Sequence, residues 1–464
     1  MAEGAPAESE KNQPSAEALY GLTPSLVRAF TEAVGARDEP RIRQLVAPVH
    51  AADKADLLER LSREQRRVAV AAMHRDFDPE ILTYINDDLR EKIVEQLSTD
   101  EVAAALVELD ADDGLTVIED LDEPQQRELL EAIPAKDRIE LEEGLSFPED
   151  SAGRLMQRDF IAVPAYWAVG QAIDFMRESG DLPEAFYEIF VVDPKHRPVG
   201  TLPLSRLLRN KRPMIIRQIM EADFKTVPAE MDQEEVAYLF DQYDLVSAPV
   251  VSEDGRLIGV VTFDDVVDVI REEAEEDIMH LGGVPETDLY RAALQTARGR
   301  FTWLLVNLAT AILASLVIYQ FDATIERLVA LAVLMPIVAS MGGNAGTQTM
   351  TVAVRALATK ELTPTNALRI LGKEVIVGGF NGILFALLMG GISALWYHDP
   401  LLGGVLGAAM IINLIVAGFF GLVIPVALER LRIDPAIAAG VLLTSVTDVV
   451  GFLAFLGLAA LILL

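Results

Sequence analysis

Long apolar runs dominate the last third of the chain. Each run is 21 to 30 residues long and uncharged, except for a single Asp in the last one. A helix that crosses a bilayer needs about 20 apolar residues, so the pattern predicts five transmembrane helices with some tilt or overhang. The runs are Phe301–Phe321, Leu328–Val354, Val375–Tyr397, Pro400–Leu428 and Pro435–Leu464.

Asp448 is the one ionisable side chain of the last run and lies near its middle. A carboxylate at that depth costs roughly 2.5–3.5 kcal/mol on insertion scales. A hydrogen bond to a neighbouring helix, a proton path or a cation path could offset this cost. None of the five runs contains a Lys or Arg to pair with Asp448, which favours a cation site. Two copies near the axis of a symmetric dimer would suit a hydrated divalent cation.

Polar groups also interrupt the second and fifth runs. Gly342 and Gly346 permit close helix approach, and Asn344 and Gln348 lie four apart on one face. In the fifth run, Thr444 shares a face with Asp448. Glycine packing with one interhelical hydrogen bond explains the second run equally well. The two neighbouring amides favour a polar path.

Basic residues indicate how the chain is oriented in a membrane. They gather before the first run and in the loops after the second and fourth, whereas the opposite side offers only Arg327. Because basic loops remain cytoplasmic, we expect a multi-pass protein of the cytoplasmic membrane. The N-terminus is then cytoplasmic and the C-terminus outside. The basic residues are Arg291, Arg298, Arg300, Arg355, Lys360, Arg369, Lys373, Arg430 and Arg432.

The first two thirds of the chain change character near residue 150. Short amphipathic helices with Asp and Pro punctuation predict a helical, superhelical N-terminal domain, with no period that can be assigned. Strand and hairpin patterns then recur twice between helices, as in Glu188–Asp193 and in Ala248–Thr262 with its Asp-Gly turn. We expect a tail at 1–20, a helical domain at 21–145, α/β modules at 146–212 and 213–270, a connecting helix at 264–290 and a transmembrane domain at 301–464.

The composition of the chain limits which ligands and metal ions it can bind. Of the formal net charge of −32, −31 lies before Trp303, which excludes general nucleic-acid binding. Net charge also favours solubility, so the excess of acid alone does not establish a site. The chain has no Cys and five His, so disulfides, thiolate sites and a nitrogen-ligated zinc site are not expected. Abundant carboxylates suit hard cations such as Mg²⁺, Ca²⁺ or Mn²⁺.

The helix predicted from Asp264 to Leu281 carries eight acidic residues. Glu272 and Glu276, like Glu273 and Asp277, are like-charged pairs four residues apart, which repel each other mildly. A solvated acidic face is one interpretation. The other is a two-state element, held by a bound cation and released when the cation leaves.

Together these features resemble the bacterial MgtE family of magnesium channels or transporters. The resemblance rests on Ser146–Met156, Gly342–Gln348, Thr447–Gly451 and the order of the domains. The two α/β modules resemble a CBS pair. The family fold is therefore expected: a helical N domain, a tandem CBS pair, a connecting helix and five transmembrane helices. CBS pairs often bind adenine nucleotides, and the residues leave open whether ATP binds here.

The resemblance implies a homodimer whose second and fifth spans line one pore. Asp448 then matches the acid of the selectivity site, and Asn344 and Gln348 match polar residues of the second span. Cytosolic Mg²⁺ would bridge acidic surfaces and close the pore. The matching acids are Asp232, Glu234, Asp241, Asp244, Asp264, Glu272, Glu275, Glu276, Asp434 at the pore mouth and, by a looser match, Asp112 and Asp113.

Three function classes follow from these residues. The first is a channel that admits Mg²⁺ down its electrochemical gradient, and the second is a coupled transporter in which Asp448 exchanges a proton. A membrane enzyme is the third, but the spans hold one mid-span Asp where an aspartyl protease needs two. No nucleophile–base pair or phosphate-binding loop is evident either. The sequence does not rank Mg²⁺ against Co²⁺, Mn²⁺ or Ca²⁺.

Overall fold

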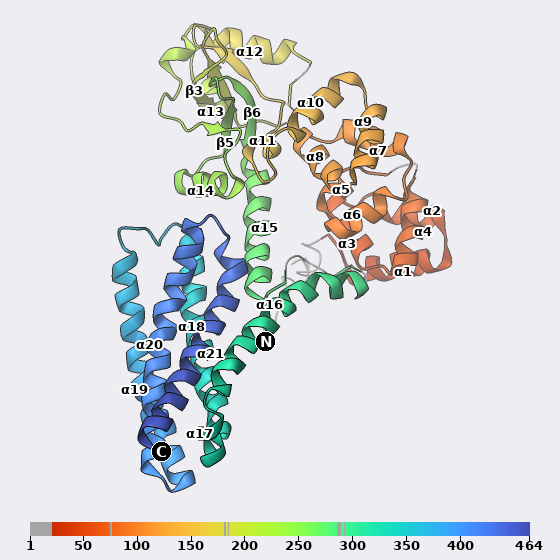
Figure 1. Ribbon diagram of the computed structural model, residues 1–464. Coiled ribbons are helices and arrows are strands. Elements are labelled where there is room, and N and C mark those ends of the chain that lie inside the picture. Colours follow the sequence, from red (N-terminus) through yellow and green to blue (C-terminus); the bar gives the residue numbers. More distant parts are fainter. Residues whose placement is uncertain (1–20, 75–76, 181, 184, 285–288, 292) are drawn as a thin grey trace, which may run out of the picture. The chain divides into compact units, whose positions relative to one another are not determined.

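The computed structural model describes residues 21–464 apart from 75–76, 181, 184, 285–288 and 292. The chain divides into two compact units, one ending at Ile270 and the other beginning at Arg271 (Figure 1). The predicted tail at 1–20 lies outside the described residues.

The first unit begins with short helices whose N-caps are regularly spaced. The caps Asp38, His50, Ser62, Asn86, Ser98, Asp110, Asp122 and Pro134 follow one another every 12 residues, with one double step after Ser62. This period was not recognised in the sequence, because Ser, Asp, Asn, His and Pro all serve as caps. The helices are α1 (Pro24–Ala36), α2 (Glu39–Val46), α3 (Ala51–Glu59), α4 (Arg63–Met73), α5 (Ile81–Tyr84), α6 (Asp87–Val94), α7 (Thr99–Glu108), α8 (Ala111–Glu119), α9 (Glu123–Ala132) and α10 (Ala135–Leu145).

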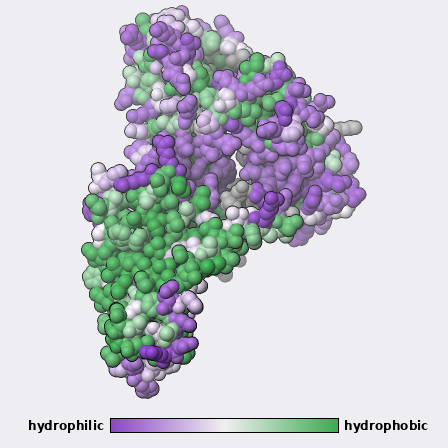
Figure 2. Space-filling model, in the orientation of Figure 1, coloured by the Kyte–Doolittle hydropathy of each residue, from purple (hydrophilic) through white to green (hydrophobic). Residues whose placement is uncertain are grey.

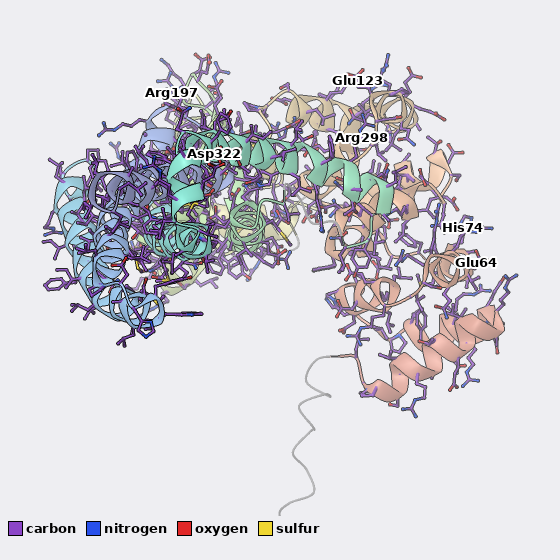
Figure 3. All side chains as sticks on the ribbon, turned by 60° about the horizontal axis from the view of Figure 1, so that its bottom comes forward. Glu64, His74, Glu123, Arg197, Arg298 and Asp322 are labelled. Atoms are coloured by element: carbon purple, nitrogen blue, oxygen red, sulfur yellow. The ribbon has the colours of Figure 1, made fainter. Side chains whose placement is uncertain are left out.

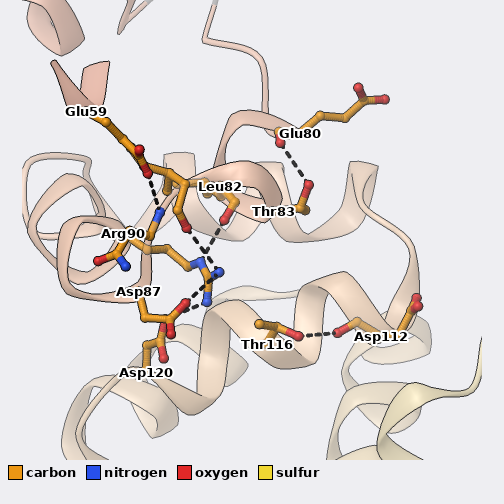
Figure 4. Close-up of polar contacts among 11 residues, drawn as sticks. Glu59, Glu80, Leu82, Thr83, Asp87, Arg90, Asp112, Thr116 and Asp120 are labelled. Atoms are coloured by element: carbon orange, nitrogen blue, oxygen red, sulfur yellow. Dashed lines mark hydrogen bonds and ion pairs between the residues drawn. The ribbon is translucent and has the colours of Figure 1, made fainter. Parts of the chain in front are cut away.

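A buried arginine joins neighbouring helices in this repeat. Arg90 on α6 donates to the carbonyl oxygens of Leu82 (2.7 Å) and Ile85 (3.3 Å), and its Nη1 lies 2.7 Å from Asp120 (Figure 4). Arg66 on α4, 24 residues earlier, makes the corresponding bonds eight and five residues back along the chain. Each guanidinium therefore donates to carbonyls at or just after the end of the preceding helix.

Two copies of one α/β module complete the first unit. In each, a short parallel strand joins an antiparallel hairpin, and the register shifts at the equivalent pairs Val191/Val192 and Val250/Val251. The predicted strands and hairpin are confirmed, with Gly255 at φ +73° in the turn. The elements are α11 (Ala152–Leu155), β1 (Ala162–Pro164), α12 (Val169–Glu178), β2 (Glu188–Val192), β3 (Pro198–Pro203), α13 (Leu204–Arg209), η3 (Ile216–Gln218), β4 (Val227–Pro228), α14 (Gln233–Tyr243), β5 (Ser247–Val251) and β6 (Leu257–Thr262).

The acidic connecting helix is α15 (Phe263–Leu281). Both ends agree with the helix predicted from Asp264 to Leu281, whereas the domain bound of 290 lies nine residues beyond the end of the helix. Gly283 follows with φ +72°, and Gly283 N donates to the carbonyl of His280, which closes the last turn. Glycine in the left-handed region is a common helix stop, which accounts for the end of α15 at Leu281.

The second unit contains the five predicted spans. Its surface is largely hydrophobic in Figure 2. They are α16 (Ala293–Tyr319), α18 (Ala330–Ala358), α19 (Ala367–Tyr397), α20 (Pro400–Arg430) and α21 (Pro435–Ile462), with the short α17 (Asp322–Arg327) after α16. Charged residues bracket the first span: Arg298 lies near the start of α16 and Asp322 follows its end (Figure 3). The third helix begins at Ala367, eight residues before the predicted Val375.

Helix α20 packs against α18, α19 and α21. Small residues make the α19–α20 approach close: a Cβ at Gly382 would lie 2.9 Å from Ile411 Cα, and one at Gly390 would lie 2.7 Å from the Gly403 carbonyl. Backbones can approach in this way only where side chains are absent. The contacts of α20 with α18 and α21 hold the two helices that carry the candidate pathway residues.

Replacing Arg90 tests the helical repeat. Arg90→Met should destabilise α5–α8 by roughly 3–5 kcal/mol, because two carbonyls and Asp120 lose a buried partner. Hydrogen exchange of the α5–α8 amides measures the loss. Arg127→Met, at an exposed i, i+4 pair with Glu123, is the control and should change little. Equal protection in the two variants would contradict this account.

Candidate cation pathway and acidic regulatory surface

Asp448 lies on α21 and is half-buried. Within the part of the chain that the structure describes, its carboxylate makes no hydrogen bond and no ion pair. The adjacent Thr447 is fully buried and donates back to the carbonyls of Leu443 and Thr444. Asp448 is thus neither sealed against a neighbouring helix nor paired with a base. A mid-span acid in this condition needs water, a proton or a cation.

The predicted polar residues of α18 divide between two faces. Gly342 and Gly346 are buried, and a Cβ at Gly346 would lie 3.1 Å from Leu443 of α21. Asn344 and Gln348 are exposed, and Asn344 Nδ2 lies 3.4 Å from Ser340 Oγ. The glycines therefore serve packing, while the amides line a face that the single chain leaves uncovered. The glycines thus agree with the packing interpretation, and the polar path stays a prediction.

Thr444 is half-buried, and its hydroxyl donates to the carbonyls of Gly440 (3.0 Å) and Val441 (3.1 Å). Its proton is therefore directed to the backbone, and its oxygen can only accept in addition. In that role Thr444 offers an oxygen to a hydrated ion, not a donor to Asp448.

Glu374 is a buried acid that the sequence prediction placed outside the third span. It lies within α19, and Thr349 of α18 donates to its Oε2 (3.1 Å) while Lys373 Nζ lies 3.2 Å from its Oε1. Thr349 directly follows Gln348, so Glu374 ties the amide-bearing helix to α19. The sequence prediction did not name Glu374, and only the packed helix reveals its burial.

At the start of α21, the Asp434 carboxylate makes two contacts. Its Oδ1 accepts from Ala436 N (2.8 Å) and caps the helix, while its Oδ2 lies 3.1 Å from Nδ1 of the buried His280 on α15. Glu276 lies 3.5 Å from His280 Nε2. Burial and Asp434 raise the pKa of Asp277, and His280 opposes this rise. The end of the connecting helix thus contacts the start of the Asp448 helix through His280, a residue the sequence prediction did not name.

In the first unit, α8 and the start of α15 bring three acids together. Burial raises the pKa of Asp112 well above its usual range, with Asp265 and Asp113 adding to the rise. The pKa of Asp113 is raised to about 6 by burial and by Asp110, against the opposing effect of Arg90. Asp112 Oδ1 is buried without a hydrogen-bond partner among the described residues. The looser prediction for Asp112 and Asp113 therefore falls on groups that do lie beside acids of α15.

Asp265 was not among the predicted site residues. Burial raises its pKa to about 7, although the Thr262 hydroxyl donates to it at 2.6 Å. Gln157 also donates to the same oxygen at 3.1 Å. Its partner acids come from a helix about 150 residues earlier, so local sequence carried no sign of this contact.

The remaining predicted acids are all exposed. Asp232 caps α14 through Glu234 N (2.9 Å), and Asp244 ends that helix at φ +51°. Across the described ranges, no group of three or more His, Asp or Glu side chains is arranged to hold a metal ion. The exposed set is Asp232, Glu234, Asp241, Asp244, Asp264, Glu272, Glu275, Glu276 and Asp434.

Comparison with known proteins assigns the chain to a family. Residues 335–458 match the model "Divalent cation transporter", residues 49–150 the "MgtE intracellular N domain", and residues 152–212 and 216–272 the "CBS domain". "Magnesium transporter MgtE" of Thermus thermophilus is 32% identical over 446 residues, covering 94% of this chain and 98% of its own. The chain belongs to the MgtE family. The Bacillus subtilis protein of the same name is 27% identical and covers 90% and 93%.

Solved structures resembling this MgtE-family chain cover its N-terminal part. The "cytosolic domain of the Mg2+ channel MgtE in complex with ATP" is 30% identical, with a TM-score of 0.49 over 52% of this chain and 99% of that one. The "soluble part of a magnesium transporter" is 24% identical, with a TM-score of 0.46 over 54% and 98%. The family order of helical domain, CBS pair and apolar helices agrees with the predicted fold class.

The acids around Asp265 predict a pH dependence. Because the pKa values of Asp265 and Asp113 are raised, the folded unit binds more protons than the unfolded chain between about pH 4 and 7. Without divalent cations, its stability should therefore fall as pH rises through this window. Asp265→Asn should raise the unfolding midpoint by a few °C (on the order of 1–2 kcal/mol) at pH 7.5 and hardly at all at pH 4.5. Equal effects at both pH values would contradict the assignment.

Proposed function

We propose that this MgtE-family protein is a channel that admits Mg²⁺ through the cytoplasmic membrane. The observation that carries the proposal is Asp448, a half-buried mid-span carboxylate without a protein partner among the described residues. The relatives named as magnesium transporters, which this chain matches over nearly its whole length, support the choice of ion.

A homodimer completes the path in this proposal. Asn344 and Gln348 lie exposed on α18, on a face without cover from their own chain. Exposed amides in a membrane-spanning helix are costly in lipid and stable beside water. Facing a second copy across a two-fold axis, this face and Asp448 would line one aqueous path.

Two Asp448 carboxylates suit a hydrated ion better than a bare one. Mg²⁺ sheds water reluctantly and keeps several waters when it binds one or two carboxylates. Water-bridged contact also leaves the ion free to move on, which conduction requires. With the basic loops in the cytoplasm, the membrane potential favours entry by about 2.3 kcal/mol per charge per 100 mV.

Cytosolic Mg²⁺ closes the pore in this proposal by neutralising the acidic surfaces. Apart from Asp112 and Asp113, the predicted acids are exposed, and the described residues form no preassembled ligand set. Weak, wet sites of this kind are suited to millimolar concentrations, at which a tight Ca²⁺ loop would remain saturated. The His280–Asp434 contact (3.1 Å) gives the last turn of α15 a direct connection to the start of the Asp448 helix.

Proton-coupled transport is the alternative, since Asp448 could titrate. A coupled carrier stops or reverses when the proton gradient is removed, whereas a channel conducts with the Mg²⁺ gradient alone. Vesicle flux with and without a protonophore separates the two.

Asp448→Asn tests the pathway. Removing the charge should lower Mg²⁺ flux into vesicles at least about tenfold, because the ion loses its main electrostatic stabilisation. Ser393→Ala, a buried hydroxyl change on α19, is the matched control and should conduct normally. Wild-type flux in Asp448→Asn would refute the pathway.

Neutralising acidic side chains of α15 tests whether this surface responds to cytosolic Mg²⁺. The triple change of Glu272, Glu275 and Glu276 to Gln should raise the internal Mg²⁺ needed for half-inhibition several-fold. Flux at low internal Mg²⁺ should stay unchanged. Glu253→Gln, an exposed acid in the β5–β6 loop, is the control. Unaltered inhibition in the triple variant would refute the role of this surface.

A further inference from the structure

Asn413 is a buried amide at the centre of the second unit. It lies on α20 and is 1% exposed, and its Nδ2 donates to the Val338 carbonyl of α18 at 2.9 Å. Its Oδ1 is buried without a hydrogen-bond partner in the described part of the chain. A buried acceptor left unpaired costs roughly 1–3 kcal/mol, and an apolar side chain would avoid that cost. Stability alone therefore does not explain an amide here.

The Asn413 amide occupies space left by two glycines on different helices. A Cβ at Gly342 of α18 would overlap the amide group, and one at Gly451 of α21 would lie 2.7 Å from Nδ2. The side chain therefore lies directly between the two backbones. Close packing of this kind tolerates neither a larger residue at the glycines nor an empty space at Asn413.

Both glycines lie next to candidate pathway residues. Gly342 precedes Asn344 by two residues, and Gly451 follows Asp448 by three. At a helical rise of 1.5 Å per residue, these offsets are about 3 Å and about 4.5 Å along the axes. A change in the α18–α21 separation at Asn413 therefore moves the Asn344 amide and the Asp448 carboxylate by nearly the same amount.

We propose that Asn413 is a positioning residue that sets the separation and register of α18 and α21, and so the placement of Asn344 relative to Asp448. This inference rests on the proposed function. The side chain is sealed from solvent, so it acts through the two helices without touching the ion. Its hydrogen bond to Val338 fixes the register of α18 against α20, and its contacts with Gly342 and Gly451 set the spacing between α18 and α21.

Replacing the amide separates positioning from stability. Asn413→Leu keeps the branched shape but loses the donor and the unpaired acceptor. We expect an unchanged or higher unfolding midpoint, together with a fall of about tenfold in Mg²⁺ flux and a changed Mg²⁺/Ca²⁺ flux ratio. Ser393→Ala, which removes another buried oxygen without a described partner, should alter neither flux nor ratio. Wild-type flux and ratio in Asn413→Leu would overturn the proposal.

A suppression experiment covers the case in which Leu does not fit. Gly342→Ala should lower both the unfolding midpoint and the flux, because the methyl group meets the Asn413 amide. Adding Asn413→Ala should restore at least part of the unfolding midpoint, since the methyl group then occupies the vacated space. Gly404→Ala on α20, where an added Cβ meets nothing within 4 Å, is the matched control.

Two measurements distinguish this inference from the proposed function: the flux of Asp448→Asn, and the unfolding midpoint of Gly342→Ala with and without Asn413→Ala. If Asp448→Asn conducts normally, the pathway is wrong, but suppression of the Gly342→Ala stability defect still supports the contact. If Asp448→Asn is inactive and the Gly342→Ala defect is not suppressed by Asn413→Ala, the pathway stands and the positioning role is overturned.

Discussion

The cost of holding a carboxylate away from bulk water governs both units of this protein. In the second unit, Asp448 lies half-buried in the middle of a helix without a described partner. In the first, burial raises the pKa values of Asp112, Asp113 and Asp265. Each arrangement is unfavourable for an ionised acid alone and becomes favourable when a cation approaches. One electrostatic constraint thus links a candidate pathway to a candidate sensor.

Close helix packing supports the pathway. Glycines of α18 and α19 allow backbone approach, and Asn413 fills the space between Gly342 and Gly451. The result is a rigid frame around α20, on which Asn344, Gln348 and Asp448 remain partly uncovered. Rigid packing suits a site that must hold a hydrated ion at a fixed distance.

The contact between α15 and α21 gives the proposed regulation a physical route. His280 lies on the last turn of an acidic helix and contacts Asp434, which caps the Asp448 helix. In the proposed function, a shift of the last turn of α15 reaches the start of α21 through this contact. The exposed acids of α15 provide the charge on which a cation can act, and their repulsion provides the opposing force.

The sequence by itself determined the five spans, the repeated α/β module and the mid-span position of Asp448. Apolar length, alternating strand pattern and an isolated charge are local signals that need no knowledge of packing. It also allowed Asn344 and Gln348 to be placed on one helical face, because that spacing is fixed by the 3.6-residue turn.

Only the tertiary structure decided which residues meet. Glu374 lay outside the predicted third span, which the structure begins at Ala367. His280, Asp265 and Asn413 gain significance only from partners distant in the chain. The 12-residue cap spacing was present in the sequence but hidden by the variety of cap residues. Contacts between distant segments depend on how whole helices pack, and a single sequence carries no local signal for that arrangement.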